Sequence, residues 1–231
     1  REGFGFEEGP LGTGKTSVAR RLLDIFGSVP GFRVVYIHTA EYKTALVALQ
    51  DIARHFDIAR RRAHIDQLRT LEKGLVDIRV EGAEPVVIID DAQRMARASL
   101  DALHALYNFE LHDKVVQVIL FAQPEFHGKI ESVPSVFSRV TSWQVLSNLP
   151  ANEALAMISF RCQTAGRDAP LFTDSGFLKL YHSTQGVPRQ IVSVCSDLLH
   201  LLARDGKNTA DAAEVDEAIA RYQLRGREGG D

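Results

Sequence analysis

An octapeptide near the start of the chain, Gly9-Pro-Leu-Gly-Thr-Gly-Lys-Thr16, meets every fixed position of the pattern G-x-x-x-x-G-K-[ST]. Its glycines allow the backbone to curl so that successive N–H groups point at one anion. The ammonium of Lys15 supplies a positive charge for β- and γ-phosphates, and the hydroxyl of Thr16 can join the shell of a Mg²⁺ ion. The pattern predicts that ATP and Mg²⁺ bind at the residues Gly9, Pro10, Leu11, Gly12, Thr13, Gly14, Lys15, Thr16 and Ser17.

The residues that follow this loop have the pattern of a helix. Apolar Val18, Leu22 and Phe26 recur on one face of residues 17–26, and Gly27 is a typical signal for the end of a helix. The loop would then open onto a helix N-terminus, where the backbone dipole favours an anion. An ordinary glycine-rich turn is the alternative interpretation, and the helix context favours the nucleotide site.

A second group of candidate residues follows an apolar run. Residues 85–90 have the composition of a buried strand, and the strand ends in two adjacent acids, Asp90 and Asp91. We predict that Asp90 binds Mg²⁺, directly or through water, and that Asp91 orients or deprotonates the attacking water. A buried strand that ends in acidic turn residues is common, but its position after a phosphate loop favours the catalytic interpretation.

These residues need a scaffold, and the hydrophobic pattern predicts a parallel sheet. Apolar, β-branched runs alternate with helical patterns, which indicates an α/β fold with helices on both faces of the sheet. The expected strands are residues 33–37, 85–90, 115–121 and, more weakly, 141–145. Residues 3–8 are poor in apolar side chains, and we expect a strand there only because the loop needs one. The expected helices of this part are residues 44–56, 65–80, 99–111 and 125–130.

After Pro150 the strand patterns stop and helical patterns follow, at residues 152–165, 174–183, 188–204 and 211–223. Asp211 and Glu214 have the spacing of a capping box, and Gly166, Gly186 and Gly206 stand where helices should end. We therefore predict three parts: a nucleotide-binding core at residues 1–148, a small all-helical lid domain at residues 149–224 and a flexible tail at residues 225–231.

Composition narrows the function classes. The 231 residues are 45% hydrophobic and 25% charged, as in soluble globular proteins, and the net charge of −3 gives no overall attraction to nucleic acid or anionic lipid. No apolar run is long enough to span a membrane. Cys162 and Cys195 lack metal-ligand spacing, and we expect two buried thiols in a reducing compartment. Because the chain begins with Arg1, we expect it to be part of a longer protein.

Three segments carry a resemblance to a known family: Asp90-Asp-Ala-Gln93, Leu103-x-x-Leu-Tyr-Asn-Phe-Glu110 and Val116-Gln-Val-Ile-Leu-Phe-Ala-Gln-Pro-Glu-Phe126. They resemble the AAA+ ATPases of the ExeA/GspA type, which are associated with type II secretion and have relatives in pilus biogenesis. More distant relatives are the transposition ATPases of the TniB/TnsC and MuB kind. The resemblance covers nearly the whole chain. It implies ATP hydrolysis, self-association as a ring or filament, and a place in the bacterial cytoplasm or in the cytoplasmic part of an inner-membrane protein.

The resemblance also implies roles for three further residues. Gln123 is similar to the sensor-1 residue that contacts the γ-phosphate or the lytic water, Arg139 to the arginine finger that reaches a neighbouring subunit's nucleotide, and Arg189 to the sensor-2 arginine of the lid. The simpler alternatives are that Gln123 is a capped polar residue at a strand end and that Arg139 is a surface arginine on a loop. Arg189 would be an exposed charge in the first turn of a helix. A positive charge there is mildly unfavourable against the helix dipole, which favours the sensor role for Arg189.

The chain departs from the family pattern at the second acid, because relatives usually carry Asp-Glu where this chain has Asp90-Asp91. The shorter side chain holds its carboxylate about one methylene further back, so hydrolysis could be slow. The N-terminal segment that normally contacts adenine is also absent, which leaves base recognition open. One resulting alternative is a nucleotide-gated switch with little hydrolysis.

We expect an ATPase that remodels or assembles a protein partner of a secretion or pilus system. The main alternative is a DNA-binding ATPase that regulates transposition. DNA binding would need a basic surface, and the chain offers one short cluster, Arg60-Arg61-Arg62 with Arg54, His55 and His64 nearby. A solvated loop is the simpler explanation of that cluster, so we expect DNA to be the less favoured partner.

Overall fold

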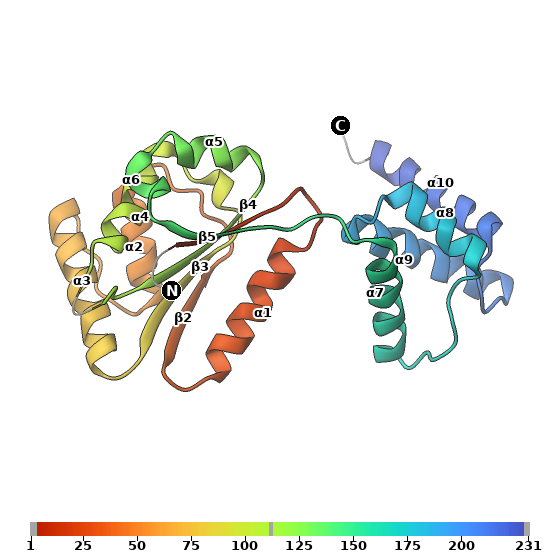
Figure 1. The fold of residues 1–231 in the computed structure, drawn as a ribbon, viewed down its shortest axis with the longest axis horizontal. Helices are drawn as coiled ribbons and strands as arrows, with labels where there is room; N and C mark the ends of the chain where they lie inside the picture. Colours follow the sequence, from red (N-terminus) through yellow and green to blue (C-terminus); the bar gives the residue numbers. More distant parts are fainter. Residues whose placement is uncertain (1–3, 111–112, 229–231) are drawn as a thin grey trace. The chain divides into compact units, whose positions relative to one another are not determined.

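The computed structural model describes residues 4–110 and 113–228, and it contains two compact units. Residues 15–146 and the segment up to Leu11 form the first unit, and residues 12–14 and the segment from Ser147 onward form the second. Figure 1 shows a twisted sheet with helices in the first unit and helices alone in the second. The prediction of a parallel α/β sheet followed by helices is confirmed.

The sheet of the first unit has five parallel strands in the order β2-β3-β4-β1-β5 (Figure 1). Strand β4 is at the centre, between β3 and β1, and β2 and β5 are the edge strands. The carboxyl ends of all five strands meet at one edge, since the strands are parallel. The strand bounds are β1 Phe4–Glu8, β2 Phe32–Ile37, β3 Glu84–Ile89, β4 Gln117–Ala122 and β5 Val140–Val145.

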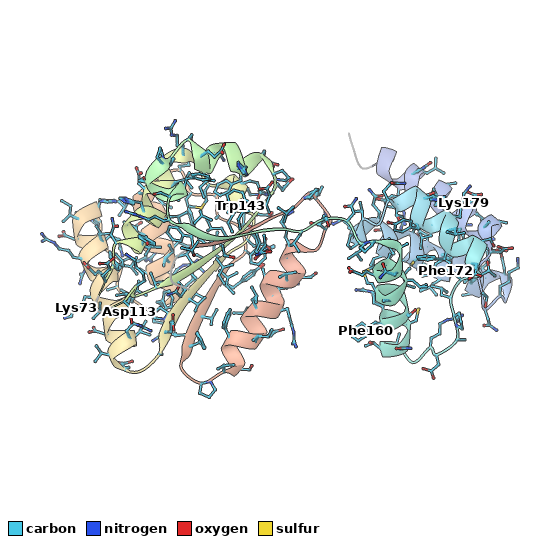
Figure 2. The ribbon with its side chains drawn as sticks, viewed as in Figure 1. Lys73, Asp113, Trp143, Phe160, Phe172 and Lys179 are labelled. Atoms are coloured by element: carbon cyan, nitrogen blue, oxygen red, sulfur yellow. The ribbon has the colours of Figure 1, made fainter. Side chains whose placement is uncertain are left out.

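The strand that the sequence indicated least clearly, β1, is confirmed. It pairs with β4 and β5, with Phe4 opposite Val118 on one side. Phe4 and Phe6 are almost fully buried, and the Phe6 ring meets Trp143 edge-on at a centroid distance of 4.2 Å. Figure 2 labels Trp143, which stands on the neighbouring strand β5. Two aromatic side chains therefore supply the buried contacts of a strand that is otherwise glycine and glutamate.

Helices cover both faces of the sheet, as expected. One face packs against α1 (Lys15–Ser28), where Ala19 meets a cluster that includes Ile88 and Phe121. The other face contributes alternate strand residues to the larger core, which also takes buried residues from α2, α3, α4, α5 and α6. The prediction that Gly27 ends α1 is wrong by one residue, because the helix continues to Ser28.

The remaining helices of the first unit differ from the sequence prediction in two places. Helix α4 ends at Tyr107, whereas the pattern predicted residues 99–111, and Glu110 forms an isolated bridge with Lys114 instead. The short α6 was not predicted; it begins with proline, a residue that suits the first helical turn. The bounds are α2 Ala45–His55, α3 His64–Val80, α4 Leu100–Tyr107, α5 Glu125–Glu131 and α6 Pro134–Phe137, with 3₁₀ turns at Ala92–Arg94 and Arg97–Ser99.

The second unit packs its helices around a separate apolar cluster, which includes Phe172, labelled in Figure 2. Glycine is required at Gly186, where φ is +72° and a Cβ would lie 2.1 Å from the Leu149 carbonyl oxygen. The predicted capping box is present as a hydrogen bond of 2.8 Å from the Asp211 N–H to Glu214 Oε2. The helices are α7 Ala151–Thr164, α8 Asp174–Thr184, α9 Pro188–Asp205 and α10 Ala212–Glu228.

Helix α10 is longer than predicted, so residues 225–228 of the expected tail are helical. Residues 229–231 lie outside the described part of the chain. Both cysteines are free thiols and are partly exposed, which differs from the expected full burial. Among the described residues, every helix is too short or too polar to cross a lipid bilayer.

Candidate nucleotide-binding site

The phosphate loop connects the carboxyl end of β1 to the first turn of α1. At its start, the Gly9 N–H donates a 3.2 Å hydrogen bond to the Ala122 carbonyl oxygen, which ties the loop to the end of β4. Gly12 and Gly14 have φ values of +88° and +104°, which side chains with a Cβ rarely adopt. Helix α1 begins at Lys15 and carries Thr16 in its first turn. The sequence therefore places an anion-binding loop at a helix N-terminus.

The ammonium of Lys15 lies over this loop. Its Nζ donates hydrogen bonds to the carbonyl oxygens of Gly9, at 2.5 Å, and Pro10, at 2.8 Å. The side chain is buried, with 7% of the residue exposed. A buried ammonium held at a glycine-rich loop, at the start of a helix, is a charge arrangement suited to an anion with several oxygens.

Asp90 directly follows β3 and is fully buried. Its carboxylate accepts hydrogen bonds from the Tyr36 hydroxyl, at 3.0 Å on Oδ2, and from the Asp91 N–H, at 2.9 Å on Oδ1. His38 Nδ1 stands 3.8 Å from the same Oδ2. Burial, and then the charge of Asp90, raise the pKa of Tyr36 to about 12, so the hydroxyl stays a donor at neutral pH. Tyr36 and His38 were not singled out from the sequence. They could have been found as two polar side chains at the end of the strand predicted at residues 33–37.

The donor set around Asp90 fits a magnesium ion. The carboxylate receives hydrogen bonds from a neutral hydroxyl and a backbone N–H, and a buried carboxylate is stabilised by pairing with a cation or by binding a metal. Thr16 offers a hydroxyl oxygen, and Mg²⁺ is bound in proteins by a few oxygen ligands together with substrate phosphates. If the ion binds, Asp90 and Thr16 are the residues predicted to hold it, and this assignment stays a prediction.

Asp91 has a left-handed backbone conformation, with φ of +50°, and begins the tight turn after β3. Its Oδ1 accepts a 3.0 Å hydrogen bond from Gln93 Nε2. Gln93 Oε1 in turn accepts a 3.2 Å hydrogen bond from the backbone N–H of Gln123 at the end of β4. Gln93 therefore joins two of the predicted catalytic residues, Asp91 and Gln123. From the sequence, no role was assigned to Gln93.

Arg139 lies at the other edge of the sheet. Its carbonyl oxygen accepts a 3.2 Å hydrogen bond from the N–H of Phe4, the first residue of β1, whereas Gly9 follows the last residue of the same strand. Five residues of strand span about 16 Å. The guanidinium group is 4.8 Å from the centroid of the Tyr107 ring. Within one chain, Arg139 therefore lies away from Lys15, Asp90 and Asp91.

Arg189 is the second residue of α9 and is exposed. Its predicted contact with nucleotide stays a prediction. The same holds for the roles of the other candidate residues, which are assigned from residue type and position.

A phosphate loop at the end of one strand of a parallel sheet, with acids at the ends of neighbouring strands, defines a P-loop nucleotide-binding fold. The chain belongs to the AAA domain family, whose model matches residues 1–130. It is also similar to General secretion pathway protein A of Aeromonas hydrophila, with 28% identity over 229 residues, which are 97% of this chain and 41% of the relative. The ExeA/GspA resemblance seen in the sequence is thereby confirmed.

Solved structures support the fold. The Aeropyrum pernix ORC2 protein, in ADPNP and ADP complexes, matches 95% of this chain and 62% of its own with a TM-score of 0.68 and 18% identity. Cdc6p from Pyrobaculum aerophilum matches 89% of this chain and 57% of its own with a TM-score of 0.69 and 16% identity. At these identities the likeness concerns the fold alone. The chain spans less than half of its secretion-pathway relative and about three-fifths of the ORC2 chain.

Proposed function

We propose that this chain binds ATP with Mg²⁺ and hydrolyses it to ADP and phosphate. The observation that carries the proposal is the convergence of three neighbouring strand ends: β1 leads into the phosphate loop, β4 into Gln123, and β3 into Asp90 and Asp91. Lys15 and the loop N–H groups bind the β- and γ-phosphates, while Thr16 and Asp90 hold the metal. When bound, Mg²⁺ neutralises charge on the phosphates.

Within this proposal Asp91 orients the attacking water and accepts its proton, and Gln123 contacts the water or the γ-phosphate. Water attacks the γ-phosphorus, the bond to the bridging oxygen breaks, and ADP leaves. The first experiment is a steady-state ATPase assay of the wild-type protein with Mg²⁺. Brisk hydrolysis would support the proposal and dismiss the switch that binds nucleotide without turnover. ATP binding without hydrolysis at any protein concentration would instead support that switch.

We further propose that the active form is an assembly in which Arg139 acts on the nucleotide of a neighbouring subunit. Support comes from its position at the amino edge of the sheet, at the far end of β1 from the phosphate loop. An arginine supplied between subunits stabilises charge in the transition state and is worth about 10³–10⁵ in rate. Residues 149–224 would serve as the lid, with Arg189 as its nucleotide sensor, and residues 1–148 as the core.

The partner that we propose is protein machinery for envelope secretion or pilus assembly, which the ATPase remodels or assembles from the cytoplasmic side. The support is the similarity to General secretion pathway protein A over nearly the whole chain. Because the match covers 41% of that relative, the activity, the partner and any membrane attachment of the whole protein are part of this proposal.

The second candidate function is DNA-stimulated ATP hydrolysis, as in a regulator of transposition. One observation favours it: Arg60, Arg61 and Arg62 are all exposed. Two glutamine side chains hold their loop, because the Arg61 carbonyl oxygen accepts a 2.6 Å hydrogen bond from Gln50 Nε2 and the Arg61 N–H donates one of 2.6 Å to Gln67 Oε1. Duplex DNA at low salt should then bind and stimulate hydrolysis, and charge reversal of Arg60 and Arg62 should remove both effects. Absence of binding and of stimulation would reject this candidate.

A further inference from the structure

We infer that Gln93 is a positioning residue that couples the Asp91 carboxylate to the end of β4, and through it hydrolysis to the state of the γ-phosphate site. This inference rests on the proposed ATPase function and goes beyond it by naming how the acid is held. The structure joins the three residues by two side-chain hydrogen bonds, from Gln93 Nε2 to Asp91 Oδ1 and from the Gln123 N–H to Gln93 Oε1.

The chemistry of the two partners fixes the orientation of the Gln93 amide. An ionised carboxylate can only accept hydrogen bonds, and a backbone N–H can only donate one. The NH₂ group must therefore face Asp91 and the oxygen must face Gln123, since the flipped amide would place donor against donor and acceptor against acceptor. One side chain thus makes two obligatory contacts of opposite polarity, and the second reaches Gln123, 30 positions from Gln93 in the chain.

The backbone of Gln93 is fixed as well. Lys129 Nζ, from α5, donates hydrogen bonds to the carbonyl oxygens of Gln93, at 2.6 Å, and of Met95, at 2.9 Å. The Met95 side chain is fully buried in the main core. The turn that carries Gln93 is therefore tied to α5 and to the core, so the amide group has few ways to leave its two partners.

This arrangement determines what Asp91 can do. The amide donor holds Oδ1 and leaves Oδ2 to accept a hydrogen bond from water. A γ-phosphate that shifts the end of β4 would move the Gln123 N–H, and the Gln93 amide would carry that movement to the Asp91 carboxylate. The residue acts through Asp91 and Gln123 and touches no reacting atom, so it should affect the rate of hydrolysis more than the affinity for ATP.

The test compares Gln93→Ala and Gln93→Glu with a control, Gln144→Ala, which removes an exposed glutamine from β5. Gln93→Glu is nearly isosteric and keeps an acceptor for the Gln123 N–H, but it replaces the donor to Asp91 with a like charge. We expect kcat to fall about tenfold or more in both Gln93 variants, because a hydrogen bond to a charged group is lost. We expect KM, the Kd for ATP and the thermal midpoint to stay within about twofold, or within a few degrees, of the wild type.

A purely structural role predicts a different pattern. Gln93→Glu, which keeps the contact to β4, would then resemble the wild type in kcat, and Gln93→Ala would lose activity only in parallel with its thermal midpoint. Either outcome overturns the inference, as does a wild-type kcat in both variants. The wild-type protein is assayed before any variant is made. If it does not hydrolyse ATP, the proposed ATPase function is rejected; if it does, the variants test the role of Gln93 separately.

Discussion

The guanidinium of Arg139 rests on the face of Tyr107, 4.8 Å from the ring centroid, at the edge of the sheet where the strands begin. The same ring stands 5.5 Å from Phe4, the first residue of β1, and receives Lys114 Nζ at 3.8 Å. The Nε of Arg139 is buried without a hydrogen-bond partner among the described residues. Tyr107 therefore contacts an arginine whose guanidinium group is incompletely hydrogen-bonded among the described residues.

The first prediction concerns this aromatic support. Replacing Tyr107 with Phe keeps the ring and should leave ATPase activity close to that of the wild type. Replacing it with Leu removes the cation–π contact, worth about 0.5–2 kcal/mol, and should lower kcat by a few-fold to about tenfold without a change in ATP affinity. Steady-state kinetics measure both effects. Equal rates for the Phe and Leu variants would show that the ring does not position Arg139.

The second prediction tests action between subunits. Lys15→Ala retains Arg139 but loses the charge that binds phosphates, whereas Arg139→Ala retains the site but loses the arginine. Each variant alone should be nearly inactive, and an equimolar mixture should recover a substantial part of the activity, because one kind of interface then combines an intact site with an intact arginine. A mixture no more active than the sum of its components would show that Arg139 does not act in trans.

The third prediction concerns the short acid of the site. Asp91→Asn removes the carboxylate charge and should lower hydrolysis by at least about 10²-fold while ATP binding persists. Asp91→Glu extends the side chain by one methylene and should raise kcat if distance to the water limits the wild type. Single-turnover hydrolysis with excess protein separates these effects from product release. A fully active Asn variant would remove Asp91 from the mechanism.

The fourth prediction concerns a thiol in the second unit. Burial, and then the nearby thiol of Cys162, raise the pKa of Cys195 to about 12. Because the thiolate is the reactive form, Cys195 in the folded protein should react with iodoacetamide far more slowly at pH 8 than an unfolded control. A raised pKa in the folded state also means that this contribution to stability is complete below pH 9 and is lost as the pH rises toward 12. Mass spectrometry of the alkylated peptide checks the rate. Alkylation at pH 8 as fast as in the unfolded control would contradict the raised pKa of this partly exposed thiol.

The sequence predicted those parts of the site that depend on one short segment. The loop from Gly9 to Thr16 and the acids after β3 were found because their residue types and spacing are restricted by the chemistry and by a strand buried on both faces. Strand β1 was expected only from the loop that follows it, because its buried contacts come from Phe4 and Phe6 alone. Local hydrophobicity underestimates a strand that is stabilised by pairing with neighbours on both sides, here β4 and β5.

What the sequence missed depends on contacts between distant residues. The link from Asp91 through Gln93 to Gln123 ends at a backbone N–H, which carries no signature in residue type. The early end of α4 at Tyr107 places that ring against Phe4 and Arg139, and the helical pattern of residues 99–111 could not indicate a tertiary contact of this kind. Local pattern therefore predicted the candidate residues, and the packed sheet shows which of them are joined by hydrogen bonds.

Equilibrium binding of a fluorescent ATP analogue in the presence of Mg²⁺ tests the central claim most directly. The wild-type protein should bind the analogue, Lys15→Ala should lose at least about 10²-fold in affinity because a charge-assisted contact to phosphate is removed, and both proteins should keep the same thermal midpoint without nucleotide. Wild-type affinity in a folded Lys15→Ala protein would contradict the assignment of a nucleotide site to this loop.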